Sequence, residues 1–186
     1  NSYTGEVLKT SENSYTVAEI SSFQLETVHR FHPVVSAILN ITPDHLNRHH
    51  TMECYAHTKE RIAENQTKDD VCVLNMEDEE LYRFGRECKA SVVWFSSKRK
   101  PDKGAYLDGD DIRYTDGTQD KLMLNIHDMN LLGTHNYENV CAAIAMTKAV
   151  GIPDDIIIEQ VKCFKAVEHR IEYVATKKGV WYYNDS

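Results

Sequence analysis

Short apolar runs rich in β-branched residues alternate with helix-like segments over the first half of this chain. The apolar runs lie at residues 16–20, 34–41, 71–74 and 91–95, and the helix-like segments lie at 52–65 and 78–89. Strands that alternate with helices typically form a mostly parallel sheet with the helices packed on its faces. We therefore expect an α/β fold built on a mostly parallel sheet flanked by helices.

The pattern changes in the second half. Short alternating runs over 105–125 are broken by Asp-Gly turns and predict three antiparallel strands. Helices are expected over 136–150 and 154–164, with Asp154 as the N-cap of the second, and a hairpin over 171–184. We therefore expect a small antiparallel β subregion in addition to the parallel sheet.

Composition argues against several classes of function. The formal net charge of −8 argues against binding through nucleic-acid phosphates, which requires clustered Lys and Arg. No apolar run of the sequence approaches the roughly 20 residues of a membrane-spanning helix. The five cysteines are odd in number and form no CxxC pair, so we expect reduced, buried thiols in a cytoplasmic protein.

Polar side chains follow the first two apolar runs. Glu19 lies at the end of the first run, and the stretch 40–49 (Asn-Ile-Thr-Pro-Asp-His-Leu-Asn-Arg-His) follows the second. Ligands of open α/β sheets bind outside the carboxyl ends of the strands. Glu19 is either a ligand of Mg²⁺, which prefers one or two carboxylates plus phosphate oxygens, or an exposed side chain at a strand end.

Lys59 is an unusual residue for its position. It falls on the apolar stripe of the predicted helix, together with Met52, Tyr55, Ala56, Ile62 and Ala63. A lysine there is costly unless it is paired, modified or able to reach water. The pattern alone favours a stem along the edge of the core with its ammonium in water, and the alternative is a lysine held in a functional site.

The histidines after the second apolar run suggest a metal. Asp44 and His45, followed by His49 and His50, could supply two or more ligands and leave a Zn²⁺ hydrolase open. The alternative is a polar loop with surface histidines, which suits His49 and His50 better than His45.

Two later stretches carry groups suited to a nucleotide. Asn136 and Asn139 are three residues apart at the start of a helix, so they share a face, and their amides can hydrogen-bond a base edge. Arg170 lies at a junction between segments, where an arginine can clamp a phosphate. The alternatives are that Asn136 is an N-cap and that Arg170 is a solvated linker residue.

In their order along the chain, these stretches resemble the Mur ligase family of ATP-dependent amino-acid ligases in peptidoglycan precursor synthesis. The family's marks are a strand-end Glu, N-[IL]-T-x-D-H-x-x-x-H, a lysine about one helix later, G-x-H-N-x-x-N, H-R-x-E and N-D-S. They stand here at Glu19, 40–49, Lys59, 133–139, 169–172 and 184–186. The stretch Ser-Ser-Phe-Gln-Leu-Glu at 21–26 resembles the members that add D-glutamate.

The resemblance implies three residues that act in catalysis and a metal shell around them. Lys59 matches a lysine that is carbamylated in the family, and His45 would join that carbamate at a second Mg²⁺. Asp44 would support the shell or orient His45. Glu19 would be the ligand of the Mg²⁺ that bridges the ATP phosphates.

The resemblance also implies contacts to the substrates. Ser21 would meet the UDP-sugar substrate. Asn136 and Asn139 would contact the adenine of ATP, Arg170 a phosphate or the ribose of the nucleotide, and Asp185 a ribose hydroxyl.

The implied activity is a carboxylate–amine ligation by a cytoplasmic monomer, with ATP and two Mg²⁺ sites. The L-alanyl carboxylate of UDP-N-acetylmuramoyl-L-alanine would take the γ-phosphate of ATP, and the amine of D-glutamate would then displace phosphate. We expect no nucleic-acid or membrane partner. The implied domains are a central, P-loop-ATPase-like domain over 1–168 and the start of a C-terminal domain over 169–186.

The sequence departs from the family at two places. A G-x-x-G-K-[ST]-like P-loop should precede Glu19 but does not occur in the 18 residues before it, so we expect this chain alone to be inactive. Asn47 stands where the family usually has Asp. The alternatives are another Mur ligase, a folylpolyglutamate-synthase-like ligase and a metal-dependent hydrolase.

Overall fold

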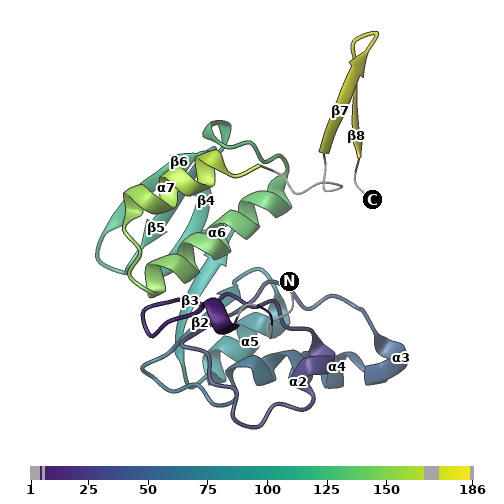
Figure 1. The fold of residues 1–186 in the computed structure, drawn as a ribbon, viewed down its shortest axis with the longest axis vertical. Helices are drawn as coiled ribbons and strands as arrows, with labels where there is room; N and C mark the ends of the chain where they lie inside the picture. The colour runs from purple at the N-terminus through teal and green to yellow at the C-terminus, as the bar shows by residue number, and fades with distance from the viewer. Residues whose placement is uncertain (1–4, 6, 166–171, 185–186) are drawn as a thin grey trace.

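The computed structural model describes residues 5, 7–165 and 172–184, and its centre is a six-stranded sheet (Figure 1). The strands are β1 (Val35–Ile38), β2 (Val71–Asn75), β3 (Ser91–Ser96), β4 (Gly104–Asp108), β5 (Asp111–Thr115) and β6 (Asp120–Asn125), and they lie side by side in this order. The first four are parallel, whereas β5 and β6 are antiparallel to their neighbours. The predicted α/β class is confirmed, and the antiparallel strands continue the same sheet.

Helices cover both faces of this sheet. On one face lie α6 (Thr134–Ala149) and α7 (Asp154–Cys163), and on the other lie α4 (Met52–Glu60) and α5 (Glu79–Glu87). The alternation of strand side chains explains the two cores, because Val73 packs toward α6 whereas Cys72 and Leu74 pack toward α5. The fold therefore has three layers, which two separate hydrophobic clusters hold together.

The remaining short elements connect these layers. They are η1 (Val7–Lys9), α2 (Ser22–Leu25), α3 (Leu46–His49), η2 (Arg61–Ala63) and η3 (Ile126–Asp128). The predicted helix at 52–65 is thus α4 followed by the 3-10 turn η2, and Thr51 caps it as predicted by accepting the N–H of Cys54.

The strand predicted at 16–20 is wrong. These residues form neither helix nor strand, and Val17 is 87% exposed. A strand needs a ladder partner, and β1 pairs only with β2 in the described part of the chain. The β-branched residues indicated a propensity for strand, but the segment has no neighbouring strand among the described residues to stabilise it.

Asp154 is not the N-cap of α7. Pro153 occupies that position, and Asp154 begins the helix with its carboxylate bound to Lys121 and Lys148, at 2.6 and 2.5 Å. A carboxylate in the first helical turn is still favourable because it faces the positive end of the helix dipole.

Gly104 allows β4 to join the sheet. Its φ of 147° lies outside the range that L side chains readily adopt, and an added Cβ would collide with the backbone carbonyl of Trp94. The missing side chain thus lets the start of β4 approach β3 closely.

The hairpin of β7 (Glu172–Lys177) and β8 (Val180–Asn184) confirms the strand pair predicted at the end of the chain. Its two-residue turn has positive φ at Lys178 and Gly179, as the tight turns of twisted hairpins require. In Figure 1 the hairpin projects away from the six-stranded sheet. Its exposed side chains include Val174, Val180 and Tyr182.

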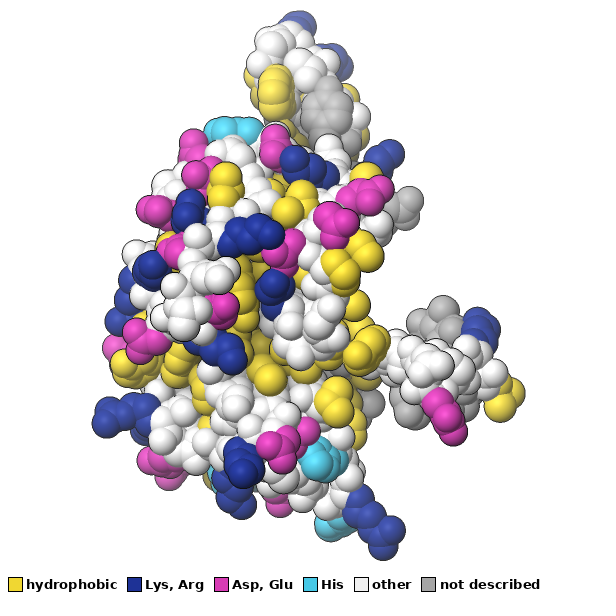
Figure 2. All heavy atoms as spheres, turned by 90° about the vertical axis from the view of Figure 1, so that its left-hand side faces the viewer, with side chains coloured by type: hydrophobic (Ala, Val, Ile, Leu, Met, Phe, Trp, Pro, Cys, Tyr) yellow, Lys and Arg dark blue, Asp and Glu magenta, His cyan; other side chains and the backbone are white. Residues whose placement is uncertain are grey.

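All five cysteines are free, as expected, but only two of them are buried. Cys72 and Cys141 lie in the cores, whereas Cys54 and Cys163 are exposed, which corrects the expectation of buried thiols. No helix among the described residues is long and apolar enough to span a membrane. Figure 2 shows acidic and basic side chains intermixed over one face of the molecule, without a basic stripe there.

Candidate functional site

The carboxyl ends of β1 and β2 are tied together by side-chain hydrogen bonds. The amide of Asn75, at the end of β2, donates to the carbonyl of Leu39 at 3.1 Å. Asp78 accepts the backbone N–H of Ile41 at 2.6 Å and also caps α5. The segment after β1 is therefore fixed at this edge, where ligands of open α/β sheets bind.

The two sequence stretches with the strongest chemical signals fold against each other. Ser22 Oγ and His49 Nε2 share a buried hydrogen bond of 3.0 Å. Arg48 donates to Glu26 through two guanidinium nitrogens, at 2.7 and 3.3 Å. Because each bond joins the stretch 21–26 to the stretch 40–49, the two stretches form one unit beside α4.

The aromatic ring of Phe23 contacts two imidazoles. It stacks on His49 with ring centroids 5.7 Å apart and planes 10° apart, and it meets His45 at 4.9 Å with a tilt of 50°. His49 is only 5% exposed and also contacts the ring of Tyr55. The interpretation of His49 as a surface histidine is therefore wrong, whereas His50 is exposed as expected.

The backbone bends sharply on both sides of α3. His45 has φ 52° and ψ 27°, and His50 has φ 66° and ψ −44°. Positive φ is uncommon for residues other than glycine and costs energy that the surrounding contacts must offset. Asp44 stabilises the first bend, because its carboxylate accepts the N–H of His45 at 2.7 Å.

Asp44 and His45 present adjacent ligand groups. Asp44 Oδ2 lies 3.4 Å from His45 Nε2, and the side chains are 60% and 47% exposed. A carboxylate and an imidazole that both reach solvent in this way are free to take a ligand from outside.

Lys59 lies half-buried at the same edge. Its ammonium donates to the carbonyl of Asn40 at 2.8 Å and lies 5.4 Å from the centre of the Tyr55 ring. Burial lowers the pKa of Lys59, and the carboxylates of Asp78 and Asp44 offset part of that shift. The ammonium thus binds the segment after β1, rather than only extending into water along the edge of the core.

Glu19 and Ser21 lie on the segment that leads into α2. Glu19 is exposed and forms no hydrogen bond or ion pair with any described residue. Ser21 is the N-cap of α2 in a capping box, in which it accepts the N–H of Gln24 and the Gln24 side chain accepts the N–H of Ser21. The described contacts therefore bring Asp44, His45 and Lys59 together but do not join Glu19 to them.

Asn136 and Asn139 lie in the first turns of α6, as predicted. Gly133 is the N-cap, so Asn136 is not, and its amide donates to the carbonyl of Leu132 at 2.7 Å. Asn139 is exposed and binds no described residue. Ser97, just after β3, donates to Glu138 at 2.5 Å. The start of α6 therefore lies beside the carboxyl end of β3, on the edge that also holds Lys59.

Arg170 and Asp185 lie outside the described residues, so their predicted contacts to the nucleotide stay predictions.

The donors at this edge fit Mg²⁺. Among the described residues no group of three or more His, Cys, Asp and Glu side chains is placed to hold a metal. Mg²⁺ does not need such a cage, since it commonly takes one or two carboxylates and completes its shell with waters and substrate phosphates. The exposed carboxylate of Asp44 and the imidazole of His45 beside it are suitable ligands of this kind, whereas no described contact places Glu19 next to them.

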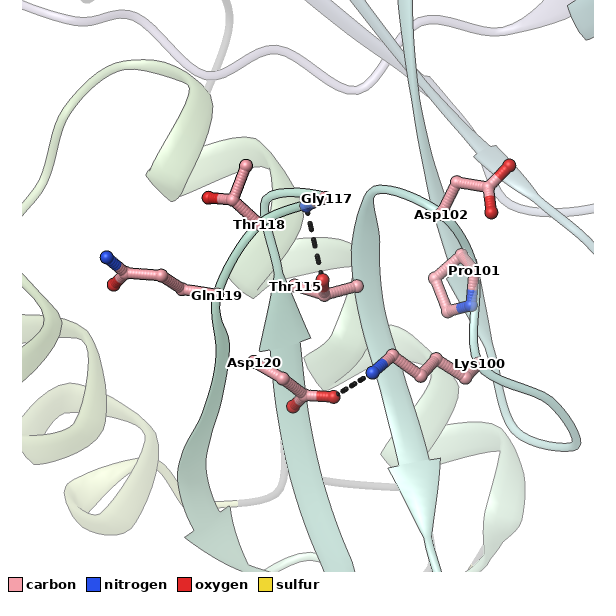
Figure 3. Close-up of a pocket in the computed structure, with 8 residues that line it drawn as sticks. All are labelled: Lys100, Pro101, Asp102, Thr115, Gly117, Thr118, Gln119 and Asp120. Carbon is pink, nitrogen blue, oxygen red and sulfur yellow. Dashed lines mark hydrogen bonds and ion pairs between the residues drawn. The ribbon is translucent and has the colours of Figure 1, made fainter.

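A separate pocket of about 300 Å³ lies between the β3–β4 loop and the β5–β6 turn (Figure 3). It is lined by Lys100, Pro101, Asp102, Thr115, Gly117, Thr118, Gln119 and Asp120. Lys100, the hydroxyl of Tyr106 and Arg113 all bind the Asp120 carboxylate and hold its pKa well below the usual range. Because this carboxylate is already satisfied and no predicted site residue lines the pocket, we place the candidate site at the carboxyl edge.

Sequence patterns missed the contacts that assemble the site. Phe23, Glu26 and His49 carry the contacts between the two stretches, and Asp78 was expected only as the start of a helix. These contacts join residues that are 22 or more positions apart in the sequence, so they produce no local pattern that could predict them. The one available signal was the density of polar and aromatic residues in each stretch.

The chain matches one protein-family model and many curated proteins. The model of the Mur ligase middle domain matches residues 3–147. The chain is 83% identical to the UDP-N-acetylmuramoylalanine–D-glutamate ligase of Lachnospira eligens, over 100% of the chain and 41% of that protein. It is 52% identical to the ligase of the same name from Lachnoclostridium phytofermentans, over 99% of the chain and 40% of that protein.

A solved structure supports the fold. The crystal structure of MurF from Acinetobacter baumannii superposes with a TM-score of 0.63 at 17% identity, covering 83% of this chain and 34% of that one. The chain thus spans about two fifths of the length of the curated relatives it matches.

Proposed function

The chain belongs to the Mur ligase family through its middle domain, and on this premise we propose that it is the central, ATP-handling part of a ligase that adds D-glutamate to UDP-N-acetylmuramoyl-L-alanine. The observation that carries the proposal is the joining of the stretch 21–26 to the stretch 40–49 beside the half-buried Lys59. The stretch 40–49 bears a mark of the whole family, and the stretch 21–26 bears the mark by which the sequence resembles the D-glutamate-adding members.

The relatives support D-glutamate as the amino acid that is added. Proteins 83% and 52% identical to this chain carry the name of a D-glutamate ligase. This likeness favours D-glutamate over the substrates of other Mur ligases or of a folylpolyglutamate-synthase-like enzyme. A metal-dependent hydrolase built on His49 is disfavoured, because Ser22 binds one nitrogen of that ring and Glu26 lies 3.7 Å from the other.

Lys59 is proposed to act as a carbamate. A neutral amine adds to CO₂, loses a proton and becomes a carbamate with two oxygen donors. The lowered pKa of Lys59 raises the fraction of neutral amine at a given pH. The contact with the Asn40 carbonyl would hold the nitrogen in place while the new oxygens point toward Asp44 and His45.

Glu19, His45 and the carbamate of Lys59 would hold Mg²⁺, with Asp44 orienting His45. When bound, Mg²⁺ neutralises phosphate charge so that two anions can approach each other. Ser21 would contact the UDP-sugar. Asn136 and Asn139 would contact the adenine, Arg170 a phosphate or the ribose, and Asp185 a ribose hydroxyl.

The proposed reaction has two steps. An oxygen of the L-alanyl carboxylate attacks the γ-phosphorus of ATP, and ADP leaves, which gives an acyl phosphate. The amine of D-glutamate then attacks the acyl carbon, loses a proton, and displaces phosphate to form the amide. The residues of this chain contribute mainly by positioning and by charge stabilisation.

We further propose that the enzyme works as a cytoplasmic monomer, with a central domain over 1–168 and a C-terminal domain that begins at 169. The hairpin β7–β8, which projects from the sheet, is consistent with this boundary (Figure 1).

Phosphate release by the full-length ligase that contains this chain tests the proposal. We expect release that requires ATP, UDP-N-acetylmuramoyl-L-alanine and D-glutamate together. A panel of other amino acids is the control for specificity. Equal release with L-lysine or D-alanyl-D-alanine in place of D-glutamate would contradict the assignment.

A further inference from the structure

The imidazole of His45 needs a support that its own segment does not supply. Its backbone is left-handed, its side chain is 47% exposed, and the carboxylate beside it, that of Asp44, is itself 60% exposed. A half-exposed ring of this kind can leave its orientation readily unless a neighbouring group restricts it.

Phe23 restricts that orientation from the other stretch. Its ring centre lies 4.9 Å from that of His45 with the planes tilted by 50°, a geometry in the favoured range for aromatic pairs. Phe23 is itself 43% exposed, so it cannot act as a support unless something fixes it in turn.

His49 fixes Phe23 from the buried side. The two rings stack with an interplanar angle of 10°. His49 is 5% exposed, with Ser22 bound to one ring nitrogen at 3.0 Å and the Glu26 carboxylate 3.7 Å from the other. The ring of Tyr55 closes the remaining side at 5.2 Å. His49 is therefore held by groups from α2 and α4.

We propose that Phe23 is a positioning residue, which transmits the fixed position of His49 to His45 and so holds the imidazole of His45 ready to bind a divalent cation. This inference rests on the proposed function, in which His45 is a ligand of Mg²⁺. It assigns a role to the aromatic residue in the centre of the Ser-Ser-Phe-Gln-Leu-Glu stretch.

Binding of Mn²⁺ to the full-length ligase, followed by the EPR signal of the free ion, tests the inference without relying on turnover. Loss of an outer partner of a metal ligand typically weakens metal binding about 10- to 100-fold, and we expect Phe23→Ala to reach at least the lower value. Phe23→Tyr keeps the ring and should bind Mn²⁺ as the wild type does.

Tyr82→Ala is the matched control. Tyr82 is 40% exposed and its ring meets Trp94 at 5.4 Å with a tilt of 37°, so it resembles Phe23 in exposure and geometry but lies on α5. We expect wild-type Mn²⁺ binding from this variant. In assays of turnover, Phe23→Ala should raise the Mg²⁺ concentration needed for half-maximal rate by the same factor as it weakens Mn²⁺ binding.

Wild-type Mn²⁺ binding by Phe23→Ala would overturn the inference, and so would an equal loss in Tyr82→Ala. Absence of Mn²⁺ binding in the wild type would overturn it as well, because no metal ligand would then need positioning. The proposed function fails separately, if the wild type releases no phosphate in response to D-glutamate.

Discussion

Lys59 both packs against the core and carries a nitrogen suited to chemistry. Its stem lies along the apolar stripe that packs Tyr55 and Ala56 into the core, while its nitrogen binds the segment after β1. Burial makes the charged form less favourable, which is the condition a lysine needs in order to react as an amine.

Lys59→Met should abolish ligation in the full-length enzyme and leave the fold intact. Methionine keeps an unbranched apolar stem of similar length but has no nitrogen to carry a carbamate. Phosphate release and the urea midpoint measure the two effects. Lys89→Met, at an exposed lysine just after α5, is the control and should retain activity. Substantial ligation by Lys59→Met would contradict the role assigned to this residue.

The buried bond between Ser22 and His49 should be measurable as a coupling. Ser22→Ala leaves a ring nitrogen without its partner, and we expect a loss of about 1–3 kcal/mol in the free energy of unfolding. In a double-mutant cycle with His49→Phe, the second change should cost less once the first is present. Strictly additive effects in urea unfolding would show that the two groups do not interact.

At the scale of elements, the junction of β3 and β4 depends on one glycine. An alanine at Gly104 would place its Cβ against the carbonyl of Trp94, and neither backbone can move without breaking the ladder. We expect Gly104→Ala to destabilise the domain by several kcal/mol, judged against the roughly 1–3 kcal/mol of a single strained residue. Gly109→Ala, at an open turn with positive φ, is the control and should cost less.

Asp120 stabilises the β4–β6 region in a way that depends on pH. The pKa of Asp120 is lower in the folded state than in the unfolded state. Its contribution to the free energy of unfolding is therefore complete above the unfolded-state pKa of about 4, and it is lost as the pH falls through the folded-state pKa. Asp120→Asn should therefore lower stability at pH 7, and its difference from the wild type should shrink below about pH 4. Urea unfolding at several pH values, with Asp102→Asn as the control, measures this window.

Elements with their own periodicity could be predicted from the sequence, and those that depend on a partner could not. The runs that became β1, β2 and β3 each bury residues between two helical layers, so their composition alone indicated strands. Residues 16–20 have the same composition, but the described chain gives them no neighbouring strand.

The candidate site likewise contains residues that could be predicted from the sequence and residues that could not. Asp44, His45 and Lys59 could be singled out from their residue types and spacing, because a polar run after a strand and a lysine on an apolar stripe are local signals. The roles of Phe23 and His49 could not, since they arise only when α2 folds against α3. Burial of His49 in particular contradicts what its polar sequence neighbours suggest.

At the scale of the whole molecule, the hairpin β7–β8 stands apart from the sheet (Figure 1). We expect a chain that ends at residue 165 to unfold at the same urea midpoint as the chain of 186 residues. The reason is that the residues of the two clusters holding the layers together all lie between Val35 and Val161. A lower midpoint after truncation would show that the hairpin helps to stabilise the sheet.

The open flank of β1 has a consequence for how the chain behaves in concentrated solution. Among the described residues β1 pairs on one side only, with β2, and the residues that flank the strand, Val34 and Leu39, are 61% and 41% exposed. Unsatisfied amide groups beside apolar side chains act as a template onto which an extended peptide can add. Preparations of these 186 residues should therefore tend to self-associate as their concentration rises, and a lysine in place of Val34 should keep them dispersed.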